Sequence, residues 1–315
     1  PAPALESFAG VANPFELRPL ESGERVVDLG AGAGTDSFLA AKAVGSRGAV
    51  IGVFDITDRV QHMFLRYLDD EQPQLEATGK QRNAVRDIYI RMDGLLGRVM
   101  EKLGDDTVLM VMSDHGFKPF RRGVNLNAWL RREGYLAVRE DADGADMFRD
   151  IDWAGTRAYA VGFGGIYLNV QGREARGPVA AGAEASSQKR EIADRLLSLR
   201  DDEKDRSAVK NVFDRDVVYR GPYVDRAPDM MVGFQVGYRA AWHAVTGGVG
   251  DRVFEDNLRP WGGDHNMNPE DVPGIFFSNR TLDREDLHIE DIAPTVLELF
   301  GVPVPGHIDG KAATL

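Results

Sequence analysis

Three short segments of the chain each bring a histidine close to an aspartate. Asp58 and His62 lie four residues apart, Asp114 and His115 are adjacent, and His265 directly follows a third aspartate. Carboxylate oxygens mixed with imidazole nitrogens form a ligand set that suits zinc, or a similar divalent ion, with an open position for substrate. These residue types therefore indicate metal-assisted chemistry.

The first pair needs a helix to bring its two side chains together. Residues 49–54 are apolar and read as a strand, and the segment that follows has apolar residues at helical spacing, including Val60 and Phe64. Positions four apart on a helix lie on the same face. We therefore expect Asp58 and His62 to project side by side from one helix.

The second pair follows residues 107–111, a short continuous apolar run that contains β-branched residues. Such a run predicts a strand buried on both faces of a parallel sheet. Ligands bind at the carboxyl edge of open α/β sheets, and Gly116 lets the backbone turn sharply there. The alternative is a simple turn in which Asp114 caps the next segment and His115 is exposed.

The third histidine, His265, lies in a glycine-rich loop at residues 262–266, ahead of the apolar run 272–277. Three separate strand or loop ends thus carry a histidine with an aspartate. Their convergence at one sheet edge would form a metal site, and this favours the metal interpretation over the simple turn.

The order of these motifs resembles the alkaline phosphatase superfamily, most closely its type I phosphodiesterase and nucleotide pyrophosphatase branch. The motifs are D-x-x-x-H at 58–62, S-D-H-G-F at 113–117 and G-D-H at 263–265. The resemblance extends from about residue 54 to the end of the chain. Further matching stretches are residues 124–130, 156–160, 165–169, 227–230, 237–239, 273–276 and 291–297.

This resemblance implies an α/β fold with a mostly parallel central sheet flanked by helices. It also implies hydrolysis of a small phosphorylated substrate with two divalent metal ions, which we expect to be zinc. One ion would be held by Asp58, His62 and His265, and the other by Asp114, His115 and a further carboxylate. Short alternating runs within residues 141–187 predict a small antiparallel insertion beside the site.

The opening of the chain has a different character. Residues 24–36 read as a strand, a glycine-rich turn and a helix start, with Gly30, Gly32 and Gly34 in the turn. This stretch resembles the first motif of class I S-adenosylmethionine-dependent methyltransferases, most closely the arsenite group. In that family an acidic residue at the end of the second strand binds the ribose, and Asp55 is the nearest candidate here, one place later than that pattern. Because no later methyltransferase motif follows, we do not expect S-adenosylmethionine to bind. A tight βα turn accounts for the glycines.

The methyltransferase-like segment stands where the phosphodiesterase family has a metal-binding aspartate and a threonine or serine nucleophile. Asp28 and Thr35 occupy the corresponding places in the order of elements, and are the candidates for those roles. The alternative is a methyltransferase remnant in which Asp28 serves only its turn, and hydrolysis would then be weak or absent. A methyltransferase fragment and a catalytically silent metal-binding chimera are the competing functions.

We therefore expect two regions: residues 1–53 as a methyltransferase-like βαβ segment, and residues 54–315 as an N-terminally incomplete alkaline phosphatase-like domain. Its insertion would span about residues 117–250.

Composition limits the remaining function classes. The 315 residues carry a formal net charge of −12, which disfavours non-specific binding to nucleic acid. The absence of cysteine rules out disulfides and thiolate metal sites. No apolar run is long enough to cross a bilayer and no leader peptide is visible, so a cytoplasmic location is the default expectation. The oligomeric state is not predicted.

Overall fold

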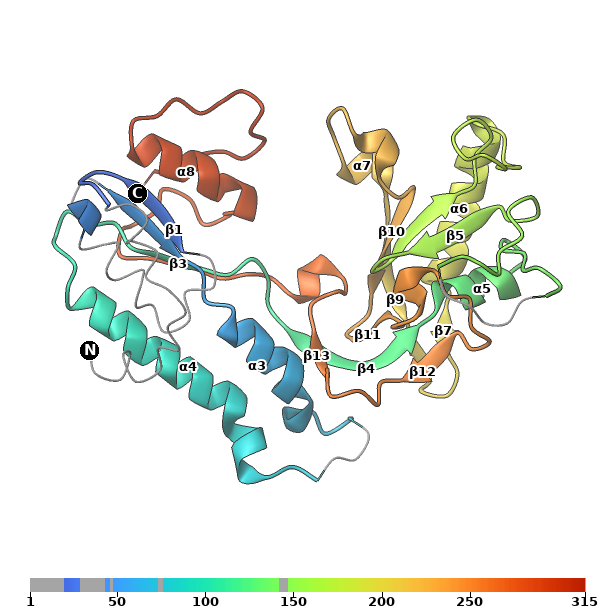
Figure 1. Cartoon of the computed structure of the whole chain (residues 1–315), viewed down its shortest axis with the longest axis horizontal. Coiled ribbons are helices and arrows are strands. Elements are labelled where there is room, and N and C mark those ends of the chain that lie inside the picture. Colours follow the sequence, from blue (N-terminus) through green and yellow to red (C-terminus); the bar gives the residue numbers. More distant parts are fainter. Residues whose placement is uncertain (1–19, 29–42, 46–47, 73–75, 142–146, 315) are drawn as a thin grey trace. The chain divides into compact units, whose positions relative to one another are not determined.

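The computed structural model describes residues 20–28, 43–45, 48–72, 76–141 and 147–314 (Figure 1). The chain divides into two compact units. Unit 1 comprises Pro1–His62, Ala77–Asp114 and Gly274–Leu315, and unit 2 comprises Met63–Glu76 and His115–Pro273. Thr35 and the three glycines of the methyltransferase-like turn lie outside the described residues.

Unit 1 combines two short strand pairs with helices. Its elements are β1 (Arg25–Asp28), β2 (Ala49–Gly52), α3 (Ile56–Phe64, which ends just inside unit 2), α4 (Gly79–Met100), β3 (Met110–Met112), β14 (Phe276–Ser278), η7 (Ile289–Asp291) and α8 (Ile292–Leu299). β1 and β2 pair in parallel, with Val26 beside Val50. The strands predicted on either side of the glycine-rich turn are therefore present, and they form a parallel pair.

The strand before Asp114 differs from the prediction. The buried parallel strand expected at residues 107–111 is instead β3, which begins at Met110 and pairs antiparallel with β14. None of its three residues is buried, and Met112 is 43% exposed. The prediction was wrong because an apolar run records hydrophobicity but not the direction or number of neighbouring strands. Among the described strands, β14 is the sole partner of β3.

Unit 2 contains most of the described strands. Its elements are η3 (Leu65–Leu68), β4 (Lys118–Val124), α5 (Leu126–Arg132), β5 (Ala158–Val161), β6 (Gly165–Leu168), α6 (Ala183–Leu197), β7 (Arg200–Asp201), β8 (Arg206–Ser207), β9 (Val209–Asp214), α7 (Arg215–Val218), η4 (Val224–Arg226), β10 (Met230–Phe234), β11 (Gly237–Ala240), η5 (Ala244–Thr246), β12 (Phe254–Asp256), β13 (Gly263–Asp264) and η6 (Pro269–Asp271). Helices and strands alternate irregularly, as in a mixed α/β unit.

Two sheets organise unit 2. One has the order β5-β6-β10-β9 and is antiparallel throughout, and it includes the antiparallel pairing expected for the runs around Tyr159 and Ile166. The other has the order β11-β4-β12, in which β11 runs parallel to β4, and β13 also pairs with β4. An α/β fold is present, but antiparallel pairs predominate among the described strands. The expected mostly parallel central sheet is not confirmed.

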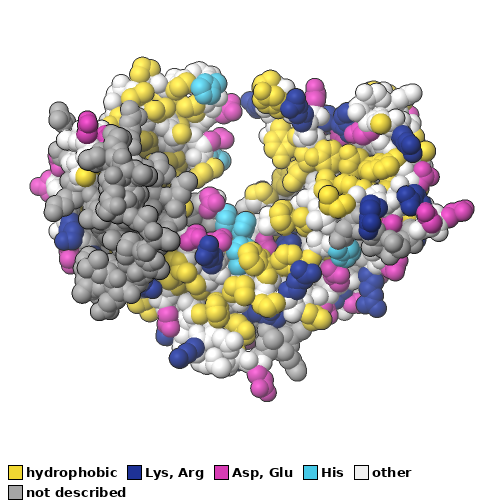
Figure 2. Space-filling model, in the orientation of Figure 1, with side chains coloured by type: hydrophobic (Ala, Val, Ile, Leu, Met, Phe, Trp, Pro, Cys, Tyr) yellow, Lys and Arg dark blue, Asp and Glu magenta, His cyan; other side chains and the backbone are white. Residues whose placement is uncertain are grey.

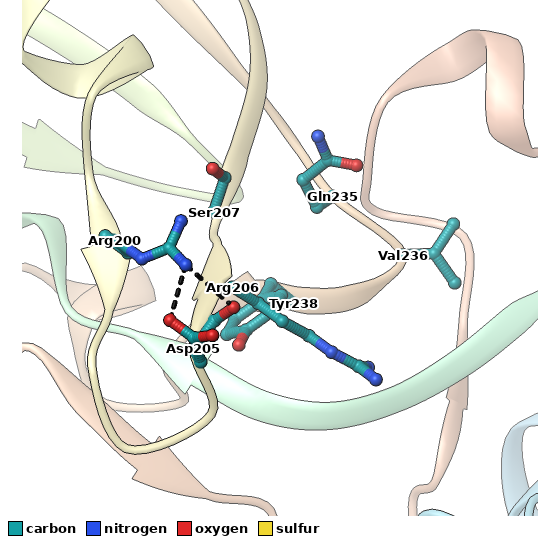
Figure 3. Close-up of a pocket in the computed structure, with 7 residues that line it drawn as sticks. All are labelled: Arg200, Asp205, Arg206, Ser207, Gln235, Val236 and Tyr238. Carbon is teal, nitrogen blue, oxygen red and sulfur yellow. Dashed lines mark hydrogen bonds and ion pairs between the residues drawn. The ribbon is translucent and has the colours of Figure 1, made fainter.

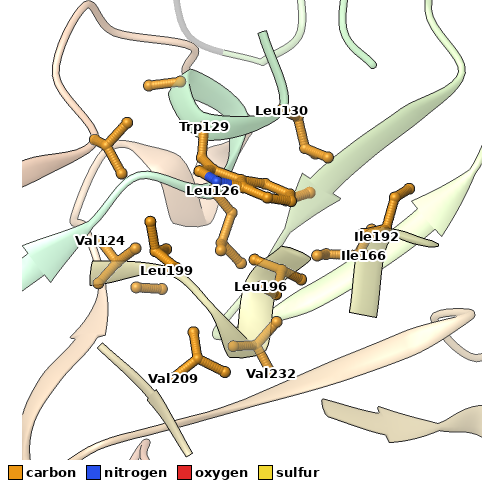
Figure 4. Close-up of a cluster of buried hydrophobic side chains, with 14 of the residues drawn as sticks. Val124, Leu126, Trp129, Leu130, Ile166, Ile192, Leu196, Leu199, Val209 and Val232 are labelled. Atoms are coloured by element: carbon orange, nitrogen blue, oxygen red, sulfur yellow. The ribbon is translucent and has the colours of Figure 1, made fainter. Parts of the chain in front are cut away.

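The core of unit 2 lies between α5, α6 and the antiparallel sheet (Figure 4). Trp129 and Leu130 from α5 and Leu196 from α6 are almost completely buried there, with Ile166 from β6. Asn125 caps α5 by accepting the backbone N–H of Ala128 at 3.0 Å, which fixes where that helix begins. This core anchors β4, the strand that immediately follows the turn containing His115.

Charged side chains of both signs are interspersed on the face shown in Figure 2. Among the residues that the structure describes, no helix combines the length and apolar character needed to cross a bilayer.

Candidate metal centre

Unit 1 holds the first carboxylate and imidazole pair on α3. Asp58 lies in the first turn of this helix and His62 lies one turn later, with Oδ1 and Nε2 3.5 Å apart. His62 is 3% exposed, whereas the Asp58 side chain is 39% exposed. A carboxylate in the first helical turn is also favoured by the helix dipole. The two side chains therefore present an oxygen and a nitrogen from one helix face.

Unit 2 holds a pair of stacked imidazoles. The rings of His115 and His265 are 3.6 Å apart between centroids and 15° from parallel. Phe117 contacts both rings, and its ring centroid lies 5.4 Å from the centroid of each imidazole. Both histidines are half-buried. The turn before β4 and the loop after β13 are held together because those two strands pair, with Asp264 opposite Lys118.

The protonation of His115 follows from its own backbone neighbour. Its Nδ1 lies 3.1 Å from the carbonyl oxygen of Gly116. Because a carbonyl oxygen only accepts, Nδ1 must carry the hydrogen and donate it. In the neutral ring, Nε2 then carries the lone pair, which is the form in which a histidine coordinates a metal.

Gly116 is needed for the turn that presents His115. Its N–H donates to the carbonyl oxygen of Val272 at 2.9 Å, and a Cβ at this position would lie 2.8 Å from the carbonyl oxygen of Pro273. That approach is shorter than side-chain carbons tolerate, and the contacted atom belongs to the backbone. Only glycine fits without displacing one of the two segments.

We expect Gly116→Ala to destabilise the protein by about 1–3 kcal/mol, because the added methyl group overpacks a backbone contact. Zinc affinity should fall about tenfold as the support of His115 shifts. Urea unfolding and competition with a chromophoric chelator measure the two effects. Gly94→Ala is the matched control, since a Cβ at Gly94 on α4 meets no atom within 4 Å. Equal behaviour of the two variants would refute the role of Gly116.

Asp264 organises the loop that carries His265. It is 1% exposed and accepts the backbone N–H groups of His265 at 2.8 Å and Asn266 at 2.9 Å. Its other oxygen accepts the Nε1–H of Trp261 at 2.9 Å and lies 2.8 Å from Nε of Arg239. Burial alone would raise the pKa of Asp264, but the charge of Arg239 and the surrounding donors lower it overall. Asp264 is therefore an ionised support of the loop.

Arg239 is the buried partner of this carboxylate. It is 1% exposed, and its guanidinium lies 4.2 Å from the ring centroid of Phe120 and 4.1 Å from that of Trp242. Burial lowers the pKa of Arg239, although the charge of Asp264 opposes that shift. Sequence reasoning found His265 but missed this support. The available signals were the aspartate before His265 and the Gly-Tyr-Arg stretch at 237–239.

Three further aspartates were predicted to belong to the candidate sites. Asp114 is exposed and directly precedes His115 in the chain. Asp55, the candidate ribose ligand, forms an ion pair with Arg59 at 3.0 Å. Asp28 is the last residue of β1, where its backbone is paired with Gly52. The structure thus brings together Asp58 with His62 in unit 1, and His115 with His265 in unit 2.

A polar cavity of about 270 Å³ in unit 2 involves none of the predicted site residues (Figure 3). Its lining residues are Arg200, Asp205, Arg206, Ser207, Gln235, Val236 and Tyr238. Arg200 donates to Asp205 across it, and the hydroxyl of Tyr238 donates to Asp201 at 3.0 Å. Burial and that carboxylate raise the pKa of Tyr238, so the phenol stays protonated and cannot serve as a base.

Two comparisons of the sequence gave matches. The family described as type I phosphodiesterase / nucleotide pyrophosphatase matches residues 27–250, a range that contains Asp58, His62, Asp114 and His115 and ends before His265. A stretch of 44 residues is 54% identical to an arsenite methyltransferase of Halobacterium salinarum, and it covers 14% of this chain and 11% of that enzyme.

Solved structures of ectonucleotide pyrophosphatase / phosphodiesterase 5 are also similar. The human protein aligns with 88% of this chain at 14% identity, with a TM-score of 0.43. The murine protein aligns with 91% of this chain at 12% identity, with the same TM-score. The alignment covers 59% of the human chain and 69% of the murine chain, so this sequence spans only part of their length.

Proposed function

The chain belongs to the type I phosphodiesterase / nucleotide pyrophosphatase family, in the alkaline phosphatase superfamily, and from this premise we propose that it hydrolyses phosphoric esters with two divalent metal ions. Membership confirms the resemblance drawn from the three histidine and aspartate motifs. The reaction, the number of ions and their identity as zinc belong to the proposal, as does a small phosphorylated substrate.

The stacked imidazoles of unit 2 are the observation that carries the two-ion proposal. Nitrogen lone pairs lie in the ring plane, so two rings only 15° from parallel keep their lone pairs in nearly parallel planes. One ligand nitrogen of each ring lies within 4.8 Å of the other, which supports a metal-binding role for both imidazoles, and the proposal gives each ring its own ion. The ring separation of 3.6 Å is close to the spacing of about 3.5–4 Å between the ions of two-metal sites.

We assign the ligands by combining these rings with the remaining carboxylates. One ion would be held by Asp58, His62 and His265. The other would be held by Asp114 and His115, with Asp28 as the candidate for the carboxylate that the family takes from its opening segment. The separation of Asp58 and His62 by 3.5 Å on α3 supports their common role, because neither side chain needs to move far to share an ion.

When bound, two divalent ions would polarise a phosphoryl oxygen and lower the pKa of the attacking hydroxyl group. His115 keeps its hydrogen on Nδ1 through the Gly116 carbonyl, which leaves Nε2 as the coordinating nitrogen. Asp264 fixes the backbone of His265 through two N–H groups. Thr35 is the proposed nucleophile, and a water molecule is the alternative attacking group.

In this proposal, the methyltransferase-like segment replaces the opening segment of the phosphodiesterase family. The matching stretch represents only 11% of the arsenite methyltransferase, too little to enclose both a cofactor and an acceptor. We propose that residues 1–53 contribute Asp28 and Thr35 to the site and do not bind S-adenosylmethionine. If they contribute neither residue, the chain binds metal but is catalytically weak or silent.

Turnover of bis(p-nitrophenyl) phosphate tests the proposed activity. We expect release of p-nitrophenolate by the zinc-loaded protein, loss of that activity with a chelator, and recovery when zinc is restored. If the hydroxyl of Thr35 is the attacking group, the zinc-loaded Thr35→Ala variant should hydrolyse the substrate more slowly than the zinc-loaded parent. A protein that holds two zinc ions and yet releases no product would contradict hydrolysis and favour the silent metal-binding chain.

A further inference from the structure

The segment that joins β9 to β10 projects from the antiparallel sheet of unit 2. The two strands pair with each other, and Asp214 at the end of β9 lies beside Met230 at the start of β10. Figure 1 shows α7, which directly follows β9, beyond the ends of these strands. Residues 216–226 are all exposed except Val224, which is half-buried. We call residues 215–226 the projecting tip.

The projecting tip exposes four large apolar side chains. Val217, Val218 and Tyr219 are consecutive, and Tyr223 follows four residues later. Val217 is 75% exposed and Tyr223 is 69% exposed. None of the four belongs to the hydrophobic core of unit 2, so their apolar character does not serve the packing of that core. Exposed apolar side chains gathered in one place mark a site of interaction with another molecule.

The unpaired charges of the projecting tip are mostly positive. Arg220 and Arg226 are exposed, as is Asp225 between them and the sheet. Among the residues that the structure describes, none of these three side chains forms an ion pair. The other acid of the tip, Asp216, is already held in ion pairs with neighbouring cations. Two free cations against one free carboxylate leave a local surplus of positive charge, although the whole chain carries −12.

The size of the tip decides between a protein partner and a membrane. A stable protein interface buries about 800 Å² on each partner and uses roughly 20–30 residues a side. Residues 215–226 are too short a segment to supply such an area by themselves. A bilayer needs no matching groove, because apolar side chains enter the boundary between headgroups and acyl chains. Tyrosine side chains favour this boundary, since the ring is apolar and the hydroxyl remains hydrated.

We propose that the projecting tip binds the surface of an anionic phospholipid bilayer. The four apolar side chains enter the boundary region, and the two arginines lie at the level of the lipid phosphates. At physiological ionic strength charges are screened over about 8 Å, so the negative charge on distant parts of the chain opposes this contact little. The inference goes beyond the proposed function and does not depend on the metal ligands.

Sedimentation of the full chain with vesicles at physiological salt tests the proposal. The vesicles contain phosphatidylcholine with about one third phosphatidylglycerol, or phosphatidylcholine alone. The parent should bind the anionic vesicles more tightly. Val217→Ser/Tyr223→Ser should lower binding to both kinds of vesicle roughly 10-fold, because insertion is lost. Arg220→Gln/Arg226→Gln should lower binding to the anionic vesicles roughly 10-fold and remove their advantage over phosphatidylcholine.

Leu258→Ser is the matched control, since Leu258 of unit 2 is 76% exposed but lies outside the tip. It should bind like the parent. Limited digestion of the parent with trypsin gives a readout that needs no variant. Anionic vesicles should slow cleavage after Arg220 severalfold relative to phosphatidylcholine vesicles, and should leave cleavage after Lys102, an exposed residue of unit 1, unchanged.

Failure of the parent to sediment with anionic vesicles would overturn the proposal. Equal losses of binding in Leu258→Ser and Val217→Ser/Tyr223→Ser would also overturn it, as would equal rates of cleavage after Arg220 with the two kinds of vesicle. A parent that elutes as a dimer and ignores vesicles, together with a tip variant that elutes as a monomer, would assign the tip to a protein interface and exclude the membrane role.

Discussion

Replacement of His265 by alanine is expected to reduce bound zinc from two ions per chain to one and to lower hydrolysis by more than about 100-fold. The proposal gives His265 to the ion that Asp58 and His62 also hold. Without its imidazole, that ion would keep only two protein ligands, fewer than the three that catalytic zinc sites normally have. Metal analysis after gel filtration and turnover of bis(p-nitrophenyl) phosphate measure the two effects.

His307→Ala provides the control for this variant, since His307 is an exposed histidine outside the proposed ligand set. It should retain both ions and full activity. The hydrogen bond that Asp264 accepts from residue 265 comes from its backbone N–H, so His265→Ala keeps this bond and should unfold like the parent when both are free of metal. Unchanged zinc stoichiometry in a folded His265→Ala protein would refute the ligand assignment.

Arg239→Met is expected to destabilise the protein by about 3–5 kcal/mol, because it leaves the buried carboxylate of Asp264 without its opposite charge. Both side chains of this pair are 1% exposed, so solvent cannot replace the lost partner. Methionine keeps much of the side-chain length against Phe120 and Trp242, which limits the loss of packing. Urea unfolding at neutral pH measures the change in free energy.

The pH dependence gives this prediction a second readout. Because the folded state lowers the pKa of Asp264, its ionisation stabilises the fold above the pKa of the unfolded chain, and that contribution is lost as the pH falls through the folded pKa. In Arg239→Met the pKa of Asp264 should be lowered less than in the parent, or raised. The variant should therefore lose less stability on acidification than the parent, and the gap between them should narrow.

Two further variants complete the comparison. Arg139→Met removes an exposed ion pair with Asp141 and should leave stability nearly unchanged. The double variant Arg239→Met/Asp264→Leu should recover part of the loss, because the unpaired buried charge is gone. A loss below about 1 kcal/mol in Arg239→Met would show that Asp264 does not depend on this arginine.

Local spacing in the sequence was sufficient to predict part of the candidate site. Asp58 and His62 could be placed on one helix face because the i,i+4 relation depends only on helix geometry, and α3 brings them to 3.5 Å. The need for glycine next to His115 could also be predicted, since a sharp turn after the histidine was expected. The close backbone approach of Pro273 could not be predicted, because it comes from a segment more than 150 residues away.

The remaining features of the fold and the site depend on pairing between strands that are distant in the sequence. The stacking of His115 on His265 depends on the pairing of β4 with β13, and no local pattern specifies which strands meet. The same limit explains the error at β3, whose apolar residues suited a buried parallel strand but pair antiparallel with β14. Arg239 was missed because burial of a charge is visible only once its partner Asp264 is located.

Anomalous diffraction at the zinc absorption edge, from crystals grown with zinc, would locate the proposed ions. We expect two peaks about 3.5–4 Å apart, one coordinated by Asp58, His62 and His265 and the other by Asp114 and His115. A single peak, or peaks away from these side chains, would contradict it. So would a map in which the imidazole of His265 and the Asp58–His62 pair do not share an ion.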